Sequence, residues 1–126
     1  IRKNNTLLDY GTGKGRVCFY LSYQTRCKTI GIEYDERIYQ GATENKETAV
    51  SGNRTSFILS SAENYELPPE VNRCYFFNPF SLEILHSVLA GYMSPITKIR
   101  ERYCCFFIIH RRNISVVYDG GTANVL

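Results

Sequence analysis

The sequence predicts an α/β fold, a three-layer sandwich in which helices cover a mostly parallel central sheet. Strand-like and helix-like segments alternate along the 126 residues, and this alternation is typical of parallel sheets with right-handed crossovers. A glycine-rich turn follows the first apolar segment directly. The length suits a single hydrophobic core, so we expect residues 1–126 to form one domain.

The first half of the chain contains three expected strands and two expected helices. Apolar and β-branched residues predict strands over Asn5–Tyr10, Lys28–Glu33 and Thr55–Ser60. Apolar residues at helical spacing predict a helix over Arg16–Thr25. A second helix is expected over Asp35–Ser51, where helix-favouring residues are dense.

The second half is expected to add further strands to the same sheet. Ala62–Val71 contains two adjacent prolines and is expected to be a loop. Arg73–Phe77 is an aromatic strand, and Ser81–Met93 carries a leucine-rich helical stripe. Arg102–His110 is apolar almost throughout, as a central strand should be. Ser115–Tyr118 is a weak candidate for a short additional strand.

The glycine-rich turn has the sequence Asp9-Tyr10-Gly11-Thr12-Gly13-Lys14-Gly15. Glycine permits positive φ and a close approach of backbone to a ligand. The G-x-G-x-G spacing fits neither the dinucleotide fingerprint nor the phosphate-binding Walker loop. An acidic residue before the glycines would also repel a pyrophosphate. The loop therefore predicts a ligand that lacks one.

Polar residues stand at the ends of the other expected strands. Glu33 ends the second strand about 20 residues beyond the loop, where a carboxylate can accept both hydroxyls of a ribose. Ser60-Ser61-Ala62-Glu63 ends the third strand and suits an adenine edge, and Asn78-Pro79-Phe80 ends the fourth. Ligands of such sheets bind at the carboxyl ends of the strands, so we expect these segments to meet.

Together these segments resemble the class I S-adenosylmethionine-dependent methyltransferases, whose fold is Rossmann-like. The glycine turn is similar to the family's first motif, and Gly31–Asp35 to its second. Ser61–Glu63 and Asn78–Phe80 are similar to the third and fourth. The fourth motif of amine-methylating members has two prolines, whereas this chain has one. The resemblance implies S-adenosyl-L-methionine as cofactor and methyl transfer as reaction.

The resemblance spans Leu7 to His110 and implies roles for particular residues. Asp9 would supply negative charge near the cofactor's ammonium, and Glu33 would hold the ribose hydroxyls. The adenine amine would meet Glu63 or the backbone beside it. The implied cofactor-binding residues are Asp9, Gly11, Thr12, Gly13, Gly15, Glu33, Tyr34, Ala62 and Glu63.

The fourth motif supplies the expected catalytic residues. Asn78, with the carbonyl of Pro79, would accept hydrogen bonds from a target amine and orient its lone pair. Phe80 would stack on a planar substrate. Methyl transfer is an in-line displacement in which positioning supplies most of the catalysis, so no metal is expected.

Each assignment has a purely structural alternative. Asp9 could cap the following helix, Glu33 could be an exposed acid at a helix start, and Glu63 could be a loop charge. Asn78-Pro79 could be only a turn. Three tyrosines are expected to pack rather than to serve a site, with cofactor contact as the alternative for the second of them: Tyr20, Tyr34 and Tyr39.

Composition leaves the partner of the protein open. Hydrophobic residues make up 44% of the chain and charged residues 21%, which is ordinary for a globular domain. The net charge of +3 permits nucleic acid as a partner but does not indicate it. A basic patch of Arg2, Lys3, Arg100, Arg102, Arg111 and Arg112 is conceivable, but a solvated surface of mixed charge is the favoured interpretation.

The cysteines and the hydropathy of the chain indicate a cytoplasmic protein. The five cysteines are odd in number and form no C-x-x-C pair, which suits neither a disulfide framework nor a zinc site. Four of them lie in hydrophobic segments and are expected in the core: Cys18, Cys74, Cys104 and Cys105. No segment approaches the roughly 18 apolar residues of a membrane span.

The leading hypothesis is a methyltransferase that acts on a nitrogen, with protein, nucleic acid or a small molecule as acceptor. One alternative is a nicotinamide-dependent oxidoreductase of similar topology, which the glycine spacing disfavours. Another is a non-catalytic nucleoside-binding module. The closing antiparallel hairpin of the family is not evident beyond Arg112, and the chain opens without Met. We therefore expect an incomplete sheet in a fragment of a longer protein, of undetermined oligomeric state.

Overall fold

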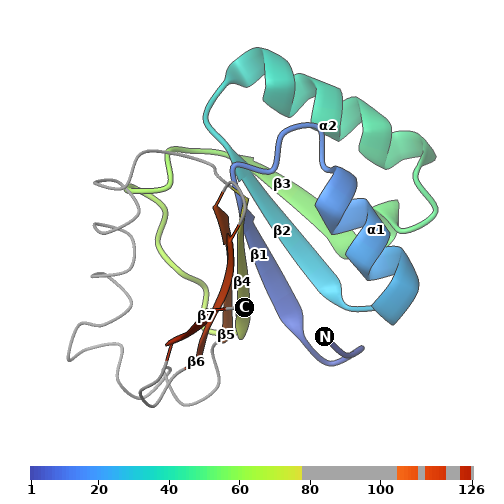
Figure 1. Ribbon diagram of the computed structural model, residues 1–126. Coiled ribbons are helices and arrows are strands. Elements are labelled where there is room, and N and C mark those ends of the chain that lie inside the picture. The colour runs from blue at the N-terminus through green and yellow to red at the C-terminus, as the bar shows by residue number, and fades with distance from the viewer. Residues whose placement is uncertain (78–104, 111–112, 119–122, 126) are drawn as a thin grey trace.

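The computed structural model of the chain describes residues 1–77, 105–110, 113–118 and 123–125, with side chains described as far as residue 75. Its helices and strands alternate in the first half, and the described segments of the second half are strands (Figure 1). In chain order they are β1 Thr6–Tyr10, α1 Arg16–Thr25, β2 Lys28–Glu33, α2 Glu36–Thr48, η1 Gly52–Arg54, β3 Thr55–Leu59, β4 Arg73–Phe77, β5 Cys105–His110, β6 Asn113–Tyr118 and β7 Ala123–Val125.

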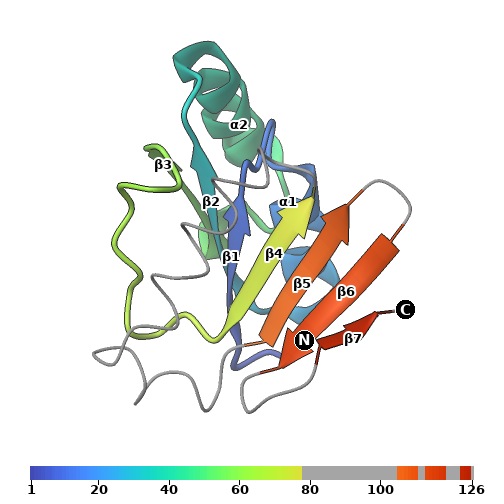
Figure 2. The same ribbon diagram turned by 60° about the vertical axis from the view of Figure 1, so that its left-hand side comes forward.

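The strands form one sheet in the order β3-β2-β1-β4-β5-β6-β7 (Figure 2). β1 pairs in parallel with β2 on one side and with β4 on the other, so the strand order reverses there. All five residues of β1 are buried. Because a ligand crevice forms where strand order reverses, the carboxyl ends of β1, β2 and β4 are the place to look for a site.

Helices α1 and α2 lie on the same face of the sheet (Figure 1). α1 begins at Gly15, whose φ of +86° only glycine adopts readily. A Cβ on Gly15 would overlap the ring of Phe57 in β3. That ring packs edge-on against Phe19 of α1, with 5.4 Å between ring centroids. The glycine therefore lets the helix start sharply and sit close to the sheet.

α2 is shorter than the expected helix Asp35–Ser51. Asp35 is its N-cap, accepting hydrogen bonds from the backbone N–H of Arg37 at 2.9 Å and of Ile38 at 3.4 Å. The chain leaves the helix at Ala49, which has extended backbone angles. The cap and the extended residue therefore account for the shorter helix, because neither position is helical.

The expected fold class, a Rossmann-like α/β fold with a mostly parallel sheet, is confirmed. The bounds of α1, β2 and β4 agree with those predicted from the sequence, and β5 lies within the expected strand Arg102–His110. The expected helix Ser81–Met93 lies outside the described residues.

The expectation that no antiparallel hairpin closes the sheet was wrong. β6 pairs antiparallel with β5, and β7 pairs antiparallel with β6. β6 spans six residues, more than the expected Ser115–Tyr118, and β7 only three. A three-residue strand carries too short a pattern to be recognised in a sequence, and its partner supplies the hydrogen bonds that define it.

The core around β1 contains cysteine as well as aliphatic residues. Cys18, Cys27 and Cys74 are not joined in disulfides and have no exposed surface, like Leu7 and Leu8. Core positions for Cys18 and Cys74 were expected, whereas that of Cys27 was not. Within the part of the chain that is described, no helix has the length and hydropathy to cross a membrane.

Candidate cofactor-binding site

The glycine turn after β1 is held down by its own backbone hydrogen bonds. Gly11, Gly13 and Gly15 have φ angles of +72°, +60° and +86°. The N–H groups of Gly11 and Thr12 both donate to the carbonyl of Ile32 at 2.9 Å, and that of Gly15 donates to Thr12 at 3.1 Å. The loop is therefore fastened to the end of β2.

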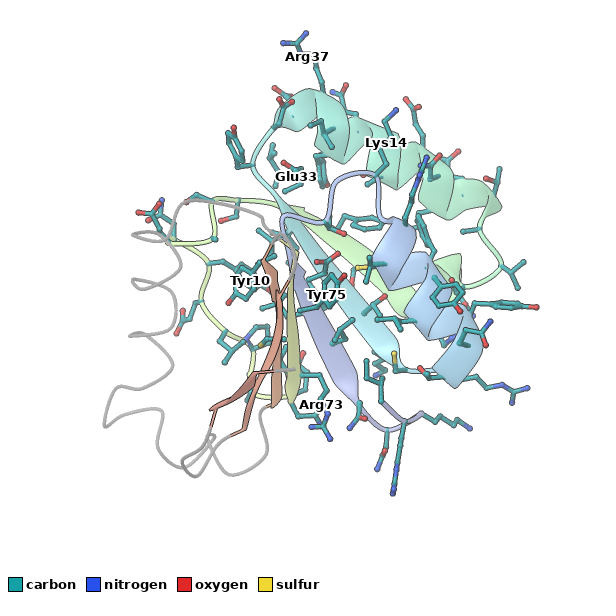
Figure 3. The ribbon with its side chains drawn as sticks, in the orientation of Figure 1. Tyr10, Lys14, Glu33, Arg37, Arg73 and Tyr75 are labelled. Atoms are coloured by element: carbon teal, nitrogen blue, oxygen red, sulfur yellow. The ribbon has the colours of Figure 1, made fainter. Side chains whose placement is uncertain are left out.

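Glu33 ends β2 and is bound by three backbone N–H groups. Its Oε2 accepts from Gly13 at 3.0 Å, and its Oε1 accepts from Tyr34 and Asp35 at 3.2 Å each. The side chain is only 6% exposed and lies beside the glycine turn (Figure 3). The alternative that Glu33 is an exposed acid at a helix start is therefore wrong.

Asp9 is buried on the α1 side of β1, with 2% of its surface exposed. Its neighbours are Thr12 and Cys18, whose thiol donates to Asp9 Oδ2 at 3.8 Å and lies 3.4 Å from the Thr12 hydroxyl. Since the hydrogen-bond partners of Asp9 are the side chains of Thr12 and Cys18 and not the first backbone N–H groups of α1, the alternative that Asp9 caps this helix is wrong.

Burial perturbs the acidity of Asp9. Desolvation raises the pKa of its carboxyl from the ordinary value of 3.8 to about 7, and the charge of Glu33 adds a smaller increase. Hydrogen bonds from Thr12 and Cys18 oppose that rise. The sequence could not distinguish Cys18 from an ordinary core cysteine, because its contact with Asp9 depends on how α1 packs.

Tyr75 of β4 is a further neighbour that the sequence did not indicate. It stands opposite Asp9 in the β1–β4 register, so both side chains project to the same face of the sheet. Burial and the nearby Asp9 raise the pKa of the Tyr75 phenol. Figure 3 shows Tyr75 on the side of the sheet that carries α1 and Tyr10 on the other side.

The end of β3 joins the same edge of the sheet. Ser60 donates its backbone N–H to the carbonyl of Glu33 at 3.0 Å. The hydroxyl of Ser61 is buried and has no hydrogen-bond partner among the described residues. Ala62 is partly buried and Glu63 is exposed. An unpartnered buried hydroxyl is uncommon in folded proteins and is often found where a ligand supplies the partner.

Several expected residues lie elsewhere or beyond the described residues. Tyr34 is 78% exposed and Tyr20 63% exposed, so the expectation that both pack in the interior was wrong. Tyr39 is partly buried. The expected catalytic residues Asn78, Pro79 and Phe80 lie outside the described residues and follow β4 in the sequence.

The arrangement suits a nucleoside ligand without a phosphate. A phosphate-binding loop offers free backbone N–H groups, but here those of Gly11, Thr12, Gly13 and Gly15 are bonded to protein acceptors. Two buried carboxylates stand at the edge instead. A Cβ on Gly13 would meet no atom within 4 Å, so the turn borders open space there. These features fit an ammonium group and a ribose diol.

Comparison with known proteins agrees with a site that lacks phosphate-binding groups. A family model described as a methyltransferase domain matches residues 1–105. No curated protein sequence matches the chain.

Solved structures show the same fold at low sequence identity. An RNA methyltransferase from Salinibacter ruber in complex with S-adenosyl-L-homocysteine has a TM-score of 0.66 at 16% identity, over 73% of this chain and 58% of that one. A SAM-dependent methyltransferase from Thiobacillus denitrificans, also in complex with S-adenosyl-L-homocysteine, has a TM-score of 0.67 at 15% identity, over 86% and 42%. The CcbJ methyltransferase from Streptomyces caelestis has a TM-score of 0.64 at 14% identity, over 97% and 68%.

The chain thus spans little more than half the length of the first of these structures and less than half of the second. The family match, by contrast, covers most of the chain and includes every strand end that forms the site. The chain belongs to the methyltransferase domain family, whose cofactor is S-adenosylmethionine.

Proposed function

We propose that the protein transfers a methyl group from S-adenosylmethionine to a nitrogen atom of an acceptor molecule, and that residues 1–126 form one cofactor-binding domain. The observation that carries the proposal is the hydrogen bond from Gly13 to Glu33, at 3.0 Å. This bond places a carboxylate at the end of β2 against a glycine turn whose N–H groups are already engaged. Such an edge favours a cationic nucleoside over a pyrophosphate.

The chain's own residues would hold the two ends of the cofactor. Asp9 supplies negative charge for the ammonium of the methionine end, and the backbone from Gly11 to Gly15 allows it to come close. Glu33 has carboxylate lone pairs beyond those used by its three N–H donors, and these can accept the ribose hydroxyls. The buried Ser61 hydroxyl and Ala62–Glu63 would meet the adenine, and the exposed Tyr34 would flank the ribose.

When bound, the cofactor supplies an electrophilic methyl group on a sulfonium. The acceptor nitrogen forms the new N–C bond as the S–C bond breaks, the bonding pair stays on sulfur, and the nitrogen loses its proton to solvent. Asn78 and the Pro79 carbonyl would orient the nitrogen lone pair, and Phe80 would stack on a planar acceptor. No strong base is needed, because alignment of the reacting atoms supplies most of the acceleration.

A labelled-methyl assay tests the proposal. The protein is incubated with methyl-labelled S-adenosylmethionine and fractions of a cell extract containing protein, nucleic acid or small molecules. We expect label in one fraction, in acid-stable linkage to nitrogen, and loss of that label with Asn78→Ala. Binding of the cofactor without transfer to any fraction would instead indicate a non-catalytic module. Tighter binding of NADH than of S-adenosylhomocysteine would indicate an oxidoreductase.

A further inference from the structure

One segment of the chain carries positive charge without any acidic residue. Between Asp9 and Glu33 the chain contains four cations and no carboxylate, and two more cations precede Asp9. The carbonyl of Asn5 accepts from the backbone of Lys28 at 3.2 Å, so the N-terminal cations lie close to the start of β2. All six side chains are exposed: Arg2, Lys3, Lys14, Arg16, Arg26 and Lys28.

The same segment exposes two aromatic rings. Tyr20 and Tyr23 of α1 are 63% and 59% exposed, whereas Cys18 and Ser22 are the buried residues of this helix. Arg16, Tyr20 and Tyr23 stand at i, i+4 and i+7, so they share the helix face that points away from the sheet. We call this surface, with Arg26 and Lys28 beyond the end of the helix, the α1 face.

The neighbouring helix has a different character. α2 mixes both signs of charge, with Glu36, Glu44 and Glu47 beside Arg37 and Lys46. Mixed charges of this kind are ordinary for a solvated helix. The absence of any acidic residue from the stretch that contains α1 is therefore a local property and does not follow from the overall charge of the chain.

We propose that the α1 face binds single-stranded nucleic acid. Exposed arginine and lysine side chains neutralise phosphates and release their counterions, which favours any polyanion. The tyrosines narrow the choice of polyanion, because exposed rings stack on unpaired bases. A duplex keeps its bases stacked on one another, and the Asp and Glu side chains of an acidic peptide carry no ring that could stack on these two. A single strand uses both features of the surface.

The position of α1 brings one end of this surface near the cofactor edge, by which we mean the carboxyl ends of β1 and β2. α1 starts at Gly15, the last glycine of the turn that lies against Glu33, and its ten residues extend about 15 Å toward the opposite edge of the sheet. A strand bound along the α1 face would therefore approach the cofactor edge at one end. Charge and exposure give the α1 face its affinity for a single strand, whichever atom receives the methyl group.

Binding is tested by fluorescence anisotropy with labelled RNA and DNA strands of about 12 nucleotides, a length within the range of single-strand sites. The test variant is Arg16→Glu/Lys28→Glu, and the matched control on α2 is Arg37→Glu/Lys46→Glu. We expect the test variant to lose about tenfold or more in affinity and to lower the salt dependence by about one to two phosphate contacts. The control should change affinity less than about twofold. Equal losses, or no binding by the unaltered protein, would overturn the proposal.

Substitution of the two tyrosines distinguishes binding of nucleic acid from binding of polyanions in general. Tyr20→Ala and Tyr23→Ala should each weaken strand binding about fivefold or more, as loss of one base stack does, and should leave binding of heparin unchanged. Unchanged strand binding, or an equal loss for heparin, would contradict the inference. Affinity for S-adenosylhomocysteine, measured on the same variants, should stay the same, so that failure here is distinguishable from failure of the methyl-transfer proposal.

Discussion

Two buried carboxylates, Asp9 and Glu33, stand at neighbouring strand ends of one sheet but in unlike surroundings. Glu33 accepts three backbone N–H groups at 3.0–3.2 Å. Asp9 has a thiol at 3.8 Å and the nearby hydroxyl of Thr12. Both are nearly inaccessible to water. The backbone therefore stabilises charge at one strand end and leaves the other to weak donors.

Because of this difference, the two residues suit different groups of a ligand. A carboxylate with three N–H partners is fixed in place and joins the glycine turn to β2, so it suits recognition of a neutral diol. A carboxylate with a pKa raised to about 7 gains most from an incoming cation, because a positive charge favours its ionised form. The same edge thus combines Glu33, which its hydrogen bonds hold in place, with Asp9, whose ionisation a bound cation would favour.

The largest expected effect concerns the pH dependence of stability at Asp9. Its pKa is about 7 in the folded protein and ordinarily 3.8. The folded state therefore keeps the proton across that interval, and the resulting stabilisation is complete below pH 3.8 and is lost as pH rises through 7. The loss amounts to as much as about 4 kcal/mol at about 1.4 kcal/mol per unit.

Chemical unfolding of wild type and Asp9→Asn across this range isolates the effect. The asparagine variant should gain stability relative to wild type as pH rises from 4 to 8 (roughly the interval between the two pKa values). A constant difference between the two proteins would show that Asp9 titrates normally.

A smaller loss of stability is expected from Glu33→Ala. The backbone N–H groups of Gly13, Tyr34 and Asp35 would lose an ionised acceptor. We expect the free energy of unfolding to fall by about 3 kcal/mol. Glu36→Ala is the control, since Glu36 is exposed in the first turn of α2. Equal stability of both variants would mean that these hydrogen bonds contribute nothing net.

Gly31→Ala should disturb the surroundings of Asp9 and leave the hydrogen bonds of Glu33 in place. An added Cβ would lie 2.6 Å from the Thr12 hydroxyl and 2.7 Å from the Phe57 ring. Overpacking of this kind costs about 2 kcal/mol, and moving Thr12 removes a donor that lowers the pKa of Asp9. Gly13→Ala meets no atom and should cost only about 1 kcal/mol from its positive φ. Thermal unfolding distinguishes the two, and a larger loss for Gly13→Ala would contradict the packing seen here.

The smallest effect is expected from Cys18→Ala. Removing the thiol takes away a weak donor and raises the pKa of Asp9 further. The pH midpoint of S-adenosylhomocysteine binding should then rise by roughly half a unit. Cys27→Ala is the matched control, because that thiol is equally buried but lies at the far end of α1. Identical midpoints for both variants would mean that Cys18 does not act on Asp9.

The sequence predicted the parts of the fold that local chemistry determines. The apolar segment before three alternating glycines defined β1 and the start of α1, and Glu33 was placed at a strand end by its spacing from the turn. The bounds of α2 depended on a side-chain cap at Asp35, and β7 depended on a partner strand. The cap is a local signal that was counted as part of the helix, whereas the three residues of β7 carry no recognisable local pattern.

The candidate site shows the same division between local and distant contacts. The glycine turn and both carboxylates were identified from the sequence alone. Cys18 and Tyr75 were not, because helix packing and strand register bring them to Asp9. The buried, unpartnered hydroxyl of Ser61 also depends on the folded chain. Exposure of Tyr20 and Tyr34 could not be predicted from aromatic character, which favours the interior only on average.

Calorimetry with S-adenosylhomocysteine on wild type, Glu33→Ala and Glu36→Ala tests most directly whether this edge holds the cofactor. The wild type and Glu36→Ala should bind alike. Glu33→Ala should bind about tenfold more weakly or worse, since a charge-assisted bond to the ribose is lost. Unchanged affinity of Glu33→Ala would contradict the assignment of Glu33 and, with it, the cofactor site proposed at the ends of β1 and β2.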